Sequence, residues 1–343
     1  MKNVKISYNN DVVSELQEEF LSILPEGYGE LGSAEGLSGL GIDALLGEIV
    51  SAVSGSGSSV LAFFLLLLGV VILSALARTL ALGSTKLVES GVSAAVSVAV
   101  FTAMYPLFYS VTETLSALGG FFSMLAPILT SLIALGGGVG TASSAGYGMS
   151  ITLWLTGIVA GGLLPGIMAA VFVSSALSAS LGQGSEQIAR GIGDVLARLM
   201  GIVGAATAAI FALQTYVSAT ADSLAMRAAR YAAGSLIPTV GATVSGALSS
   251  LVGGLSYTGG LIGASSVAVI IGIAVSPLVI LLLYRLAFYF ASLVAQFIGG
   301  GVRCVTSFGK TLDALISVYV MTTMIYIFEI LMLIWGGNKI FGA

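Results

Sequence analysis

Few residues in this 343-residue chain have the chemistry of a catalytic or ligand-binding site. The sequence has no histidine and a single cysteine, Cys304, which excludes an intrachain disulfide, a Cys/His zinc site and histidine-based acid/base catalysis. Gly309, Lys310 and Thr311 match the end of a phosphate-binding P-loop, but that motif requires a further glycine where Cys304 stands. We therefore expect no catalytic residue, no metal site and no cofactor, and we predict that the chain is not an enzyme.

Ionisable residues inside apolar segments are the remaining candidates, because a charge within a membrane is costly and is often retained for a function. Glu329 stands between Phe328 and Ile330 in the last apolar run, whereas Glu113 and Arg285 lie at expected span ends. A structural alternative is that such side chains pair internally or extend to the membrane surface. Glu329 is the strongest candidate of the three.

The composition is typical of a membrane protein. Hydrophobic residues make up 57% and charged residues 8% of the sequence, and the mean hydropathy is +1.07, whereas soluble proteins carry roughly 25% charged residues. Residues 1–50 hold nine acids and two bases, and residues 51–343 hold seven acids and ten bases. Because the bases form no clustered face, the expected partner is the lipid bilayer and not nucleic acid.

Two regions follow from this charge distribution. We predict an acidic soluble or interfacial N-terminal segment over residues 1–58 and a transmembrane helical domain over residues 59–343. In the first region, residues 11–24 have apolar side chains at helical spacing and precede Pro25, which predicts a short amphipathic helix. Residues 40–53 are a second candidate helix, lying against the membrane surface.

The expected fold is all-α, a polytopic membrane protein with about eight membrane segments. Each segment is an apolar run of roughly the length that crosses a hydrocarbon core of about 30 Å, and glycine-rich stretches separate the runs. The sixth and seventh segments form a hairpin that either crosses the bilayer or enters and returns, so the sixth is a candidate re-entrant helix. The expected segments are 60–77, 90–112, 120–136, 149–178, 200–221, 239–256, 262–284 and 312–335.

Basic residues near the ends of spans predict the orientation, since Lys and Arg favour the cytoplasmic side. Residues 78–88, 222–232 and 303–311 together hold six bases. Placing these three stretches inside the cell puts the N-terminus outside.

Residues 226–241, MRAARYAAGSLIPTVG, resemble the signature of the stage III sporulation protein AE family. A basic segment with Arg227 and Arg230 runs through an aromatic turn into an Ile-Pro-x-x-Gly bend that contains Pro238 and Gly241. These four residues are therefore candidate functional or structural positions.

A second similar region covers residues 121–145, where a span containing Pro127 leads into a small-residue loop that begins with Gly136 and Gly137. The resemblance extends from about residue 12 to about residue 335. It departs from the family at Ser235, where asparagine is usual. Pro127, Gly136 and Gly137 join Glu329 and the signature residues as candidates.

The resemblance implies a non-enzymatic membrane core component of a secretion-like channel complex between mother cell and forespore during endospore formation. The implied location is the cell membrane, as a multi-pass protein, in the mother-cell membrane around the forespore. The implied partners are the other stage III A operon membrane proteins, ring-forming proteins and an ATPase. Self-association into a homo-oligomer is an open alternative.

Two other classes of function stay open on the residues alone. An independent multi-pass small-molecule transporter, a permease, would place its site at broken helices near the bilayer centre and would show two related halves. A membrane-embedded enzyme would need a constellation of polar residues facing the interior, which the sequence does not indicate.

Overall fold

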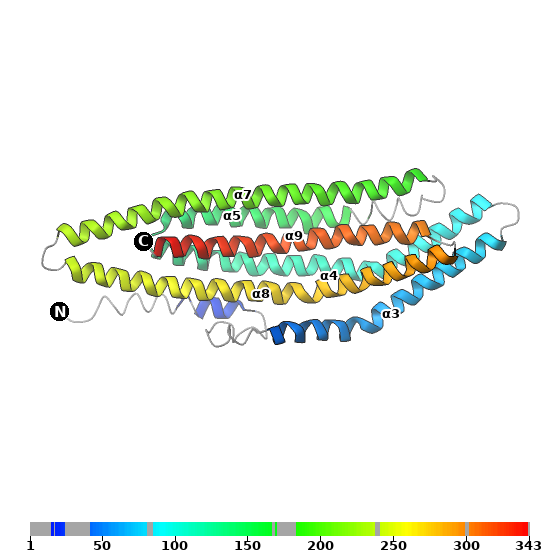
Figure 1. Cartoon of the computed structure of the whole chain (residues 1–343), viewed down its shortest axis with the longest axis horizontal. Helices are drawn as coiled ribbons and strands as arrows, with labels where there is room; N and C mark the ends of the chain where they lie inside the picture. Colours follow the sequence, from blue (N-terminus) through cyan, green and yellow to red (C-terminus); the bar gives the residue numbers. More distant parts are fainter. Residues whose placement is uncertain are drawn as a thin grey trace.

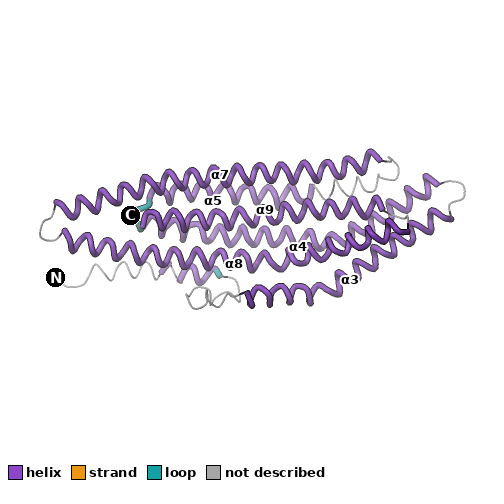
Figure 2. Tube along the Cα trace, in the orientation of Figure 1, coloured by secondary structure: helices purple, strands orange, loops and turns teal. Residues whose placement is uncertain are grey.

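The computed structural model describes residues 15–16, 18–24, 42–80, 85–166, 169, 183–236, 241–298 and 302–341. Within these ranges the chain is helical apart from short turns, and they contain no strand. The predicted all-α fold is therefore confirmed for this part of the chain. Figures 1 and 2 show an elongated bundle of long helices lying side by side. Apolar runs form helices in lipid because a helix satisfies its own backbone hydrogen bonds.

Successive long helices run in opposite directions along the bundle (Figure 1). α9 packs along both α7 and α8, α3 packs along α8, and α5 packs along α4 and α7. The helices of the described ranges are α3 (Ile42–Leu80), α4 (Thr85–Leu135), α5 (Val139–Ile158), the π-helical turn η2 (Val159–Leu163), α7 (Gln183–Leu236), α8 (Gly241–Ile298) and α9 (Val302–Phe341).

Several of these helices are much longer than a bilayer is thick. α4 has 51 residues, α7 has 54 and α8 has 58. At a rise of about 1.5 Å per residue these helices are roughly 75 to 90 Å long, against a hydrocarbon core of about 30 Å. The bundle therefore extends beyond the hydrocarbon region of a membrane.

Five helices of the described ranges have windows long and apolar enough to cross a membrane. Large apolar side chains also remain exposed along them, for example Leu73, Tyr109 and Trp154, as expected for faces that contact lipid. Together these features identify a helical membrane protein. The candidate spans are Leu46–Ala77, Ser97–Leu135, Val139–Gly166, Leu255–Ile298 and Phe308–Ile340.

The structure does not support the predicted count of eight segments. Residues 239–256 and 262–284 were expected as the arms of a hairpin, but α8 is one continuous helix from Gly241 to Ile298, so the hairpin is wrong. Segments 90–112 and 120–136 likewise both belong to α4. The reason is that a glycine costs a helix only about 1 kcal/mol, whereas a break in lipid leaves backbone groups without partners.

Two further predicted boundaries lie inside helices. α7 contains both the expected span 200–221 and the polar segments on either side of it, and it is not among the five helices of the described ranges that have a candidate span. α3 begins at Ile42, so most of the predicted surface helix 40–53 is continuous with the first span. α3 also runs through residue 58, and the division of the chain there stays a prediction.

The predicted orientation grouped stretches that lie at opposite ends of the bundle. α7 runs away from the ends of α3 and α9 that carry residues 78–88 and 303–311, so residues 222–232 lie at the other end (Figure 1). The physical reason is that residues 183–232 lie on one continuous helix and not on an excursion followed by a separate span. Arg190 and Arg198, at the start of α7, join the first group, which still holds six bases.

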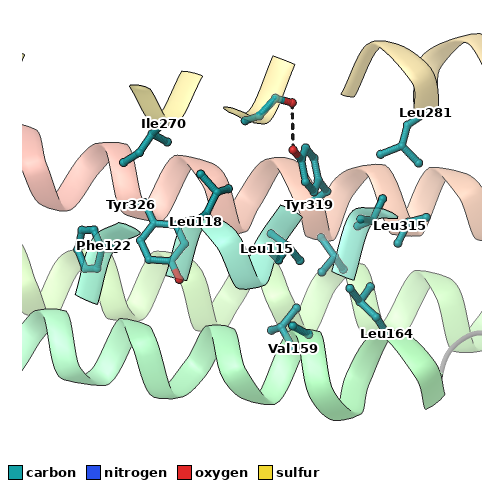
Figure 3. Close-up of a cluster of buried hydrophobic side chains, with 14 of the residues drawn as sticks. Leu115, Leu118, Phe122, Val159, Leu164, Ile270, Leu281, Leu315, Tyr319 and Tyr326 are labelled. Atoms are coloured by element: carbon teal, nitrogen blue, oxygen red, sulfur yellow. Dashed lines mark hydrogen bonds between the residues drawn. The ribbon is translucent and has the colours of Figure 1, made fainter. Parts of the chain in front are cut away.

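A single apolar core runs along the bundle. Figure 3 shows α4, η2, α8 and α9 contributing to it, with Leu115, Val159 and Leu315 among the labelled side chains. The Tyr319 hydroxyl crosses from α9 to donate to the Ala274 carbonyl of α8 at 3.0 Å. Residues 15–16 and 18–23 of the predicted N-terminal helix are helical, and Phe20 is fully buried in this core.

Candidate functional site

Three helices, α5, α7 and α9, meet along a seam of glycines and small polar side chains. A Cβ built on Gly148 of α5 would lie only 2.0 Å from the ring of Phe211 on α7. On α9, a Cβ built on Gly336 would lie 3.0 Å from the methyl carbon of Thr215. Small residues of this kind let membrane helices pack closely. Polar side chains within the seam must therefore find their partners inside the protein.

Glu329 of α9 is the one buried acidic side chain in the described ranges, with 1% of its surface exposed. The Thr152 hydroxyl of α5 donates a hydrogen bond to Oε1 of this carboxyl group. Its other oxygen, Oε2, has no hydrogen-bond partner within the described part of the chain. Glu329 lies eleven positions before Ile340, the end of the candidate span, which is roughly 17 Å of helix. The carboxyl group therefore lies well inside the membrane-spanning part of α9.

Tyr326 lies one turn before Glu329 on α9 and is also fully buried. Its ring packs against Phe122 of α4, with the ring centroids 4.7 Å apart. Its hydroxyl has no hydrogen-bond partner within the described part of the chain. Gly119 of α4 makes room for it, since a Cβ there would lie 3.4 Å from the hydroxyl oxygen. Figure 3 shows Tyr326 between α4 and α5.

A buried carboxyl group with one orphaned oxygen has a definite electrostatic requirement. An acidic side chain at the centre of a membrane helix costs about 3 kcal/mol on insertion scales. No Lys or Arg of the described ranges pairs with Glu329 to offset that cost. Glu329 therefore requires a neutralising partner, which is either a proton or a bound cation.

A small cavity opens in the seam beside Thr152. Thr152, Thr156 and Thr322 form its polar lining, and Gly204 and apolar side chains complete it. The Thr156 hydroxyl donates to the Thr152 carbonyl at 2.7 Å, and the Thr322 hydroxyl donates to the Val318 carbonyl at 2.8 Å. Both hydroxyl oxygens keep lone pairs that can accept. Thr152 thus lies between the carboxyl group of Glu329 and a small, mainly apolar cavity.

At one end of the seam, a three-glycine turn joins α4 to α5. Gly137 has φ +91, and its N–H donates to the Ala134 carbonyl at 3.0 Å. The N–H of Gly138 donates to the Ile133 carbonyl at 2.9 Å. This pair of bonds is the Schellman motif, which requires a left-handed residue at the position of Gly137. The chain breaks at Gly136 as predicted, but α5 begins at Val139, so most of the predicted small-residue loop is helical. The motif gives the reason for glycine at position 137.

Asp222 of α7 caps the N-terminus of α5 from a distant part of the sequence. Its carboxylate accepts hydrogen bonds from the N–H of Thr141 at 2.7 Å, from the Thr141 hydroxyl at 2.8 Å and from the N–H of Gly140 at 3.3 Å. These N–H groups have no partner within the helix, and a negative charge also complements the helix dipole. Asp222 therefore fixes α5 to α7 at this end of the seam.

Lys339 marks the same end of the bundle. Its Nζ donates to the Thr220 hydroxyl at 2.8 Å and lies 4.2 Å from the ring centroid of Tyr216 and 5.0 Å from that of Trp335. The two rings stack, with their centroids 5.8 Å apart. A base between Trp and Tyr is characteristic of a membrane surface, so this cluster marks a boundary of the hydrocarbon region.

Arg285 pairs with an acidic side chain of the protein, as the structural alternative predicts. Its Nη2 lies 2.9 Å from Oδ2 of Asp313, and the contact joins α8 to α9. Both side chains are partly exposed, at 33% and 49%. This pair satisfies two charges within apolar helices and does not form a buried polar site.

The structure brings only some of the predicted candidates together. Gly137 contacts Met226, since a Cβ there would lie 2.2 Å from Cε of that side chain, and Met226 precedes the exposed Arg227. The two family-like regions therefore meet at one end of the seam, away from Glu329. Whether these candidates act in function stays a prediction. Of the remaining candidates, Arg230 lies near the end of α7, Gly241 begins α8, Pro127 lies inside α4, and Pro238 lies outside the described residues.

Thr152 and Asp222 are the structurally important residues that the sequence did not identify. Thr152 is 177 residues away from Glu329 in the chain, and threonine is common throughout the apolar segments. Asp222 stood in an expected polar segment, where an exposed acid needs no explanation. It is 81 residues away from Thr141, at the helix start that it caps, so no local capping pattern in the sequence marks it.

Comparisons with known proteins give one consistent result. A family model described as Stage III sporulation protein AE matches residues 33–337. The chain is 23% identical, over 237 residues, to the Stage III sporulation protein AE of Bacillus subtilis (strain 168), an alignment that covers 66% of this chain and 58% of that relative. The chain thus spans somewhat over half the length of this curated relative. No solved structure matches.

Proposed function

This chain belongs to the stage III sporulation protein AE family, which supports a role in sporulation, and from that premise we propose that it is a non-enzymatic membrane core component of a secretion-like channel complex between mother cell and forespore. In this role it provides the membrane-embedded base for other stage III A operon proteins, ring-forming proteins and an ATPase. Its place is the mother-cell membrane around the forespore. The chain works by assembly and not by chemistry of its own.

The observation that carries this proposal, beyond family membership, is the length of the helices. α7 and α8, with 54 and 58 residues, exceed the hydrocarbon core by roughly 50 Å each. Helix that protrudes from the lipid presents side chains to water and to other proteins. Exposed apolar residues near the ends of these helices, such as Tyr231 on α7 and Phe297 on α8, offer contact sites for partners.

The distribution of bases supports an orientation for this component. The bundle end that carries the junctions from α3 to α4 and from α8 to α9 also carries the start of α7, and together they hold six bases. The opposite end holds Arg227, Arg230 and Lys339. We place the six-base end in the mother-cell cytoplasm, so that the end with the Trp335 cluster faces the other way.

Co-purification tests the assembly role. The tagged chain is extracted from sporulating cells in a mild detergent, and the proteins that accompany it are identified by mass spectrometry. We expect the other stage III A proteins to be recovered, and the matched control is an unrelated tagged multi-pass protein from the same cells. Recovery of this chain alone, as a stable oligomer, contradicts the proposal.

One observation favours the alternative of an independent transporter. Glu329 is buried and bonded to Thr152, which lines a small cavity, and the π-helical turn η2 follows α5 nearby. Transporters place their sites at such interruptions, although their two halves usually each supply one. Solute uptake by vesicles that contain only this chain would favour the transporter, whereas uptake that requires the partner proteins favours the channel component.

A further inference from the structure

Glu329 is a buried ionisable group that the assembly role does not use. Its side chain is 1% exposed, and Oε1 accepts a hydrogen bond from Thr152. Oε2 has no partner in the described ranges. A carboxylate in this setting would carry an uncompensated charge in an apolar interior. The group must therefore bind something positive.

The surroundings of Glu329 suit a proton better than a metal ion. No three acidic or sulfur side chains of the described ranges gather as metal ligands do. Within the described part of the chain, the Thr152 hydroxyl is the hydrogen-bond partner of the Glu329 carboxyl group, and Oε2 has none. Hard cations take about six or more oxygen ligands, whereas a proton needs one oxygen. The orphaned Oε2 supplies that oxygen.

We propose that Glu329 is a proton-binding site inside the seam of α5, α7 and α9. Oε2 takes up one proton from water, and the carboxylate becomes a neutral acid, while Oε1 continues to accept from Thr152. The cavity lined by Thr152, Thr156 and Thr322 lies directly beside this hydrogen bond.

No charged side chain of the described ranges pairs with Glu329, so no ion pair controls its protonation. From α9, the titratable group that interacts electrostatically with it is the Tyr326 hydroxyl, one turn away. From α5, Thr152 and Thr156 contribute hydroxyls only. No Asp, Glu, Lys or Arg of the described parts of α4, α7 or α8 forms an ion pair or hydrogen bond with it. Asp222 and Lys339 are engaged with Thr141 and Thr220 at the end of the bundle.

This site does not depend on the proposed assembly role. It concerns the purified chain alone, so it is tested without any partner. A failure of carbodiimide to label Glu329 would leave co-purification unaffected, and the reverse also holds.

Carbodiimide labelling of the full chain in lipid vesicles tests the proposal. Dicyclohexylcarbodiimide is apolar and enters a membrane bundle, and the O–H of a carboxylic acid adds across one of its N=C bonds with nothing lost. Mass spectrometry then locates the adduct. We expect labelling at Glu329 at mildly acidic pH, and it should fall by roughly tenfold per pH unit above the midpoint, as release of one proton requires.

Three variants make the readout specific. Glu329→Gln should abolish the adduct at this position, whereas Glu113→Gln, which changes an exposed acid of α4, should leave labelling of Glu329 unchanged. Thr152→Val keeps the carboxyl group but removes its donor. Because the carboxylate form then loses a hydrogen bond, labelling of this variant should persist to higher pH. A residue with a purely structural role would show no such shift.

Three outcomes would overturn the proposal. The first is a folded protein that is not labelled at Glu329 although the same residue is labelled after denaturation in dodecyl sulfate. The second is labelling that does not change with pH. The third is protection by added sodium at constant pH, which would show that an alkali cation, and not a proton, occupies the site.

Discussion

The contact of Gly148 with Phe211 leads to a substitution whose effect on stability opposes local propensity. In Gly148→Ala, the new Cβ would lie 2.0 and 2.3 Å from two ring carbons of Phe211, where 3.4 Å or more is ordinary contact. Phe211 is 2% exposed, so its ring has little room to move aside. Overpacking of this kind costs up to about 3 kcal/mol, and the helix-propensity gain of alanine over glycine returns about 1 kcal/mol. We expect a net loss of about 2 kcal/mol.

A matched control lies on the same helix. A Cβ added at Gly146 would meet no atom within 4 Å outside its own helix, so Gly146→Ala should gain the propensity term alone, about 1 kcal/mol. The two single-methyl changes should therefore shift stability in opposite directions. The assay is reversible unfolding of the purified protein in mixed detergent micelles, followed by circular dichroism over a dodecyl sulfate gradient.

A compensating change separates steric conflict from other causes. Phe211→Leu shortens the side chain that meets the new methyl group, so it should recover part of the loss in Gly148→Ala, because residues in contact are not additive. If Gly148→Ala is as stable as the unchanged protein, the close packing of α5 on α7 at this point is refuted.

Three other expectations follow from the described contacts. Asp222→Ala removes the cap of α5 and should lower the unfolding free energy by about 1 to 3 kcal/mol in the same detergent assay. An effect no larger than that of Glu113→Gln, a change at an exposed site, would count against the cap. Thr152→Val should lower the unfolding free energy by a similar amount, because Oε1 of Glu329 loses its donor. Ser150→Ala, at an exposed site on the same helix, should stay within about 0.5 kcal/mol of the unchanged protein. Single cysteines that replace Arg198 and Arg227 in a Cys304→Ser background should react with an impermeant thiol reagent from opposite sides of the membrane, and reaction from the same side would contradict α7 as one crossing helix.

The membrane class and the all-α fold could be predicted from the sequence, because charge depletion and apolar runs are global signals. The division into segments could not, since a glycine pair such as Gly119 and Gly120 predicts a break in a soluble protein, whereas α4 continues through it. In a bilayer, a break exposes unpaired backbone groups, so the helix continues through them. The break at Gly136 was predicted correctly because Gly137 adopts a backbone conformation that favours glycine.

Part of the candidate site was also within reach of the sequence. Glu329 could be identified because a lone acid in an apolar run is unusual, and the structure adds that it is buried. Its partner Thr152 could not, since a threonine gives no local sign of a contact 177 residues away. The seam itself depends on glycines at Gly148, Gly204 and Gly336, three among 46 in the chain. Which glycines contact another helix is decided by the fold alone.

Because α7 and α8 are so long, a small change in their tilt moves their ends by a large distance. The two helices are joined by the short stretch 237–240, and each has more than half of its length beyond what a hydrocarbon core requires. If a helix of roughly 80 Å pivots about its midpoint, a tilt of about 5° displaces its tip by roughly 3.5 Å. A small adjustment of packing around the seam is thus enlarged at the tips, to about the width of a contact between side chains.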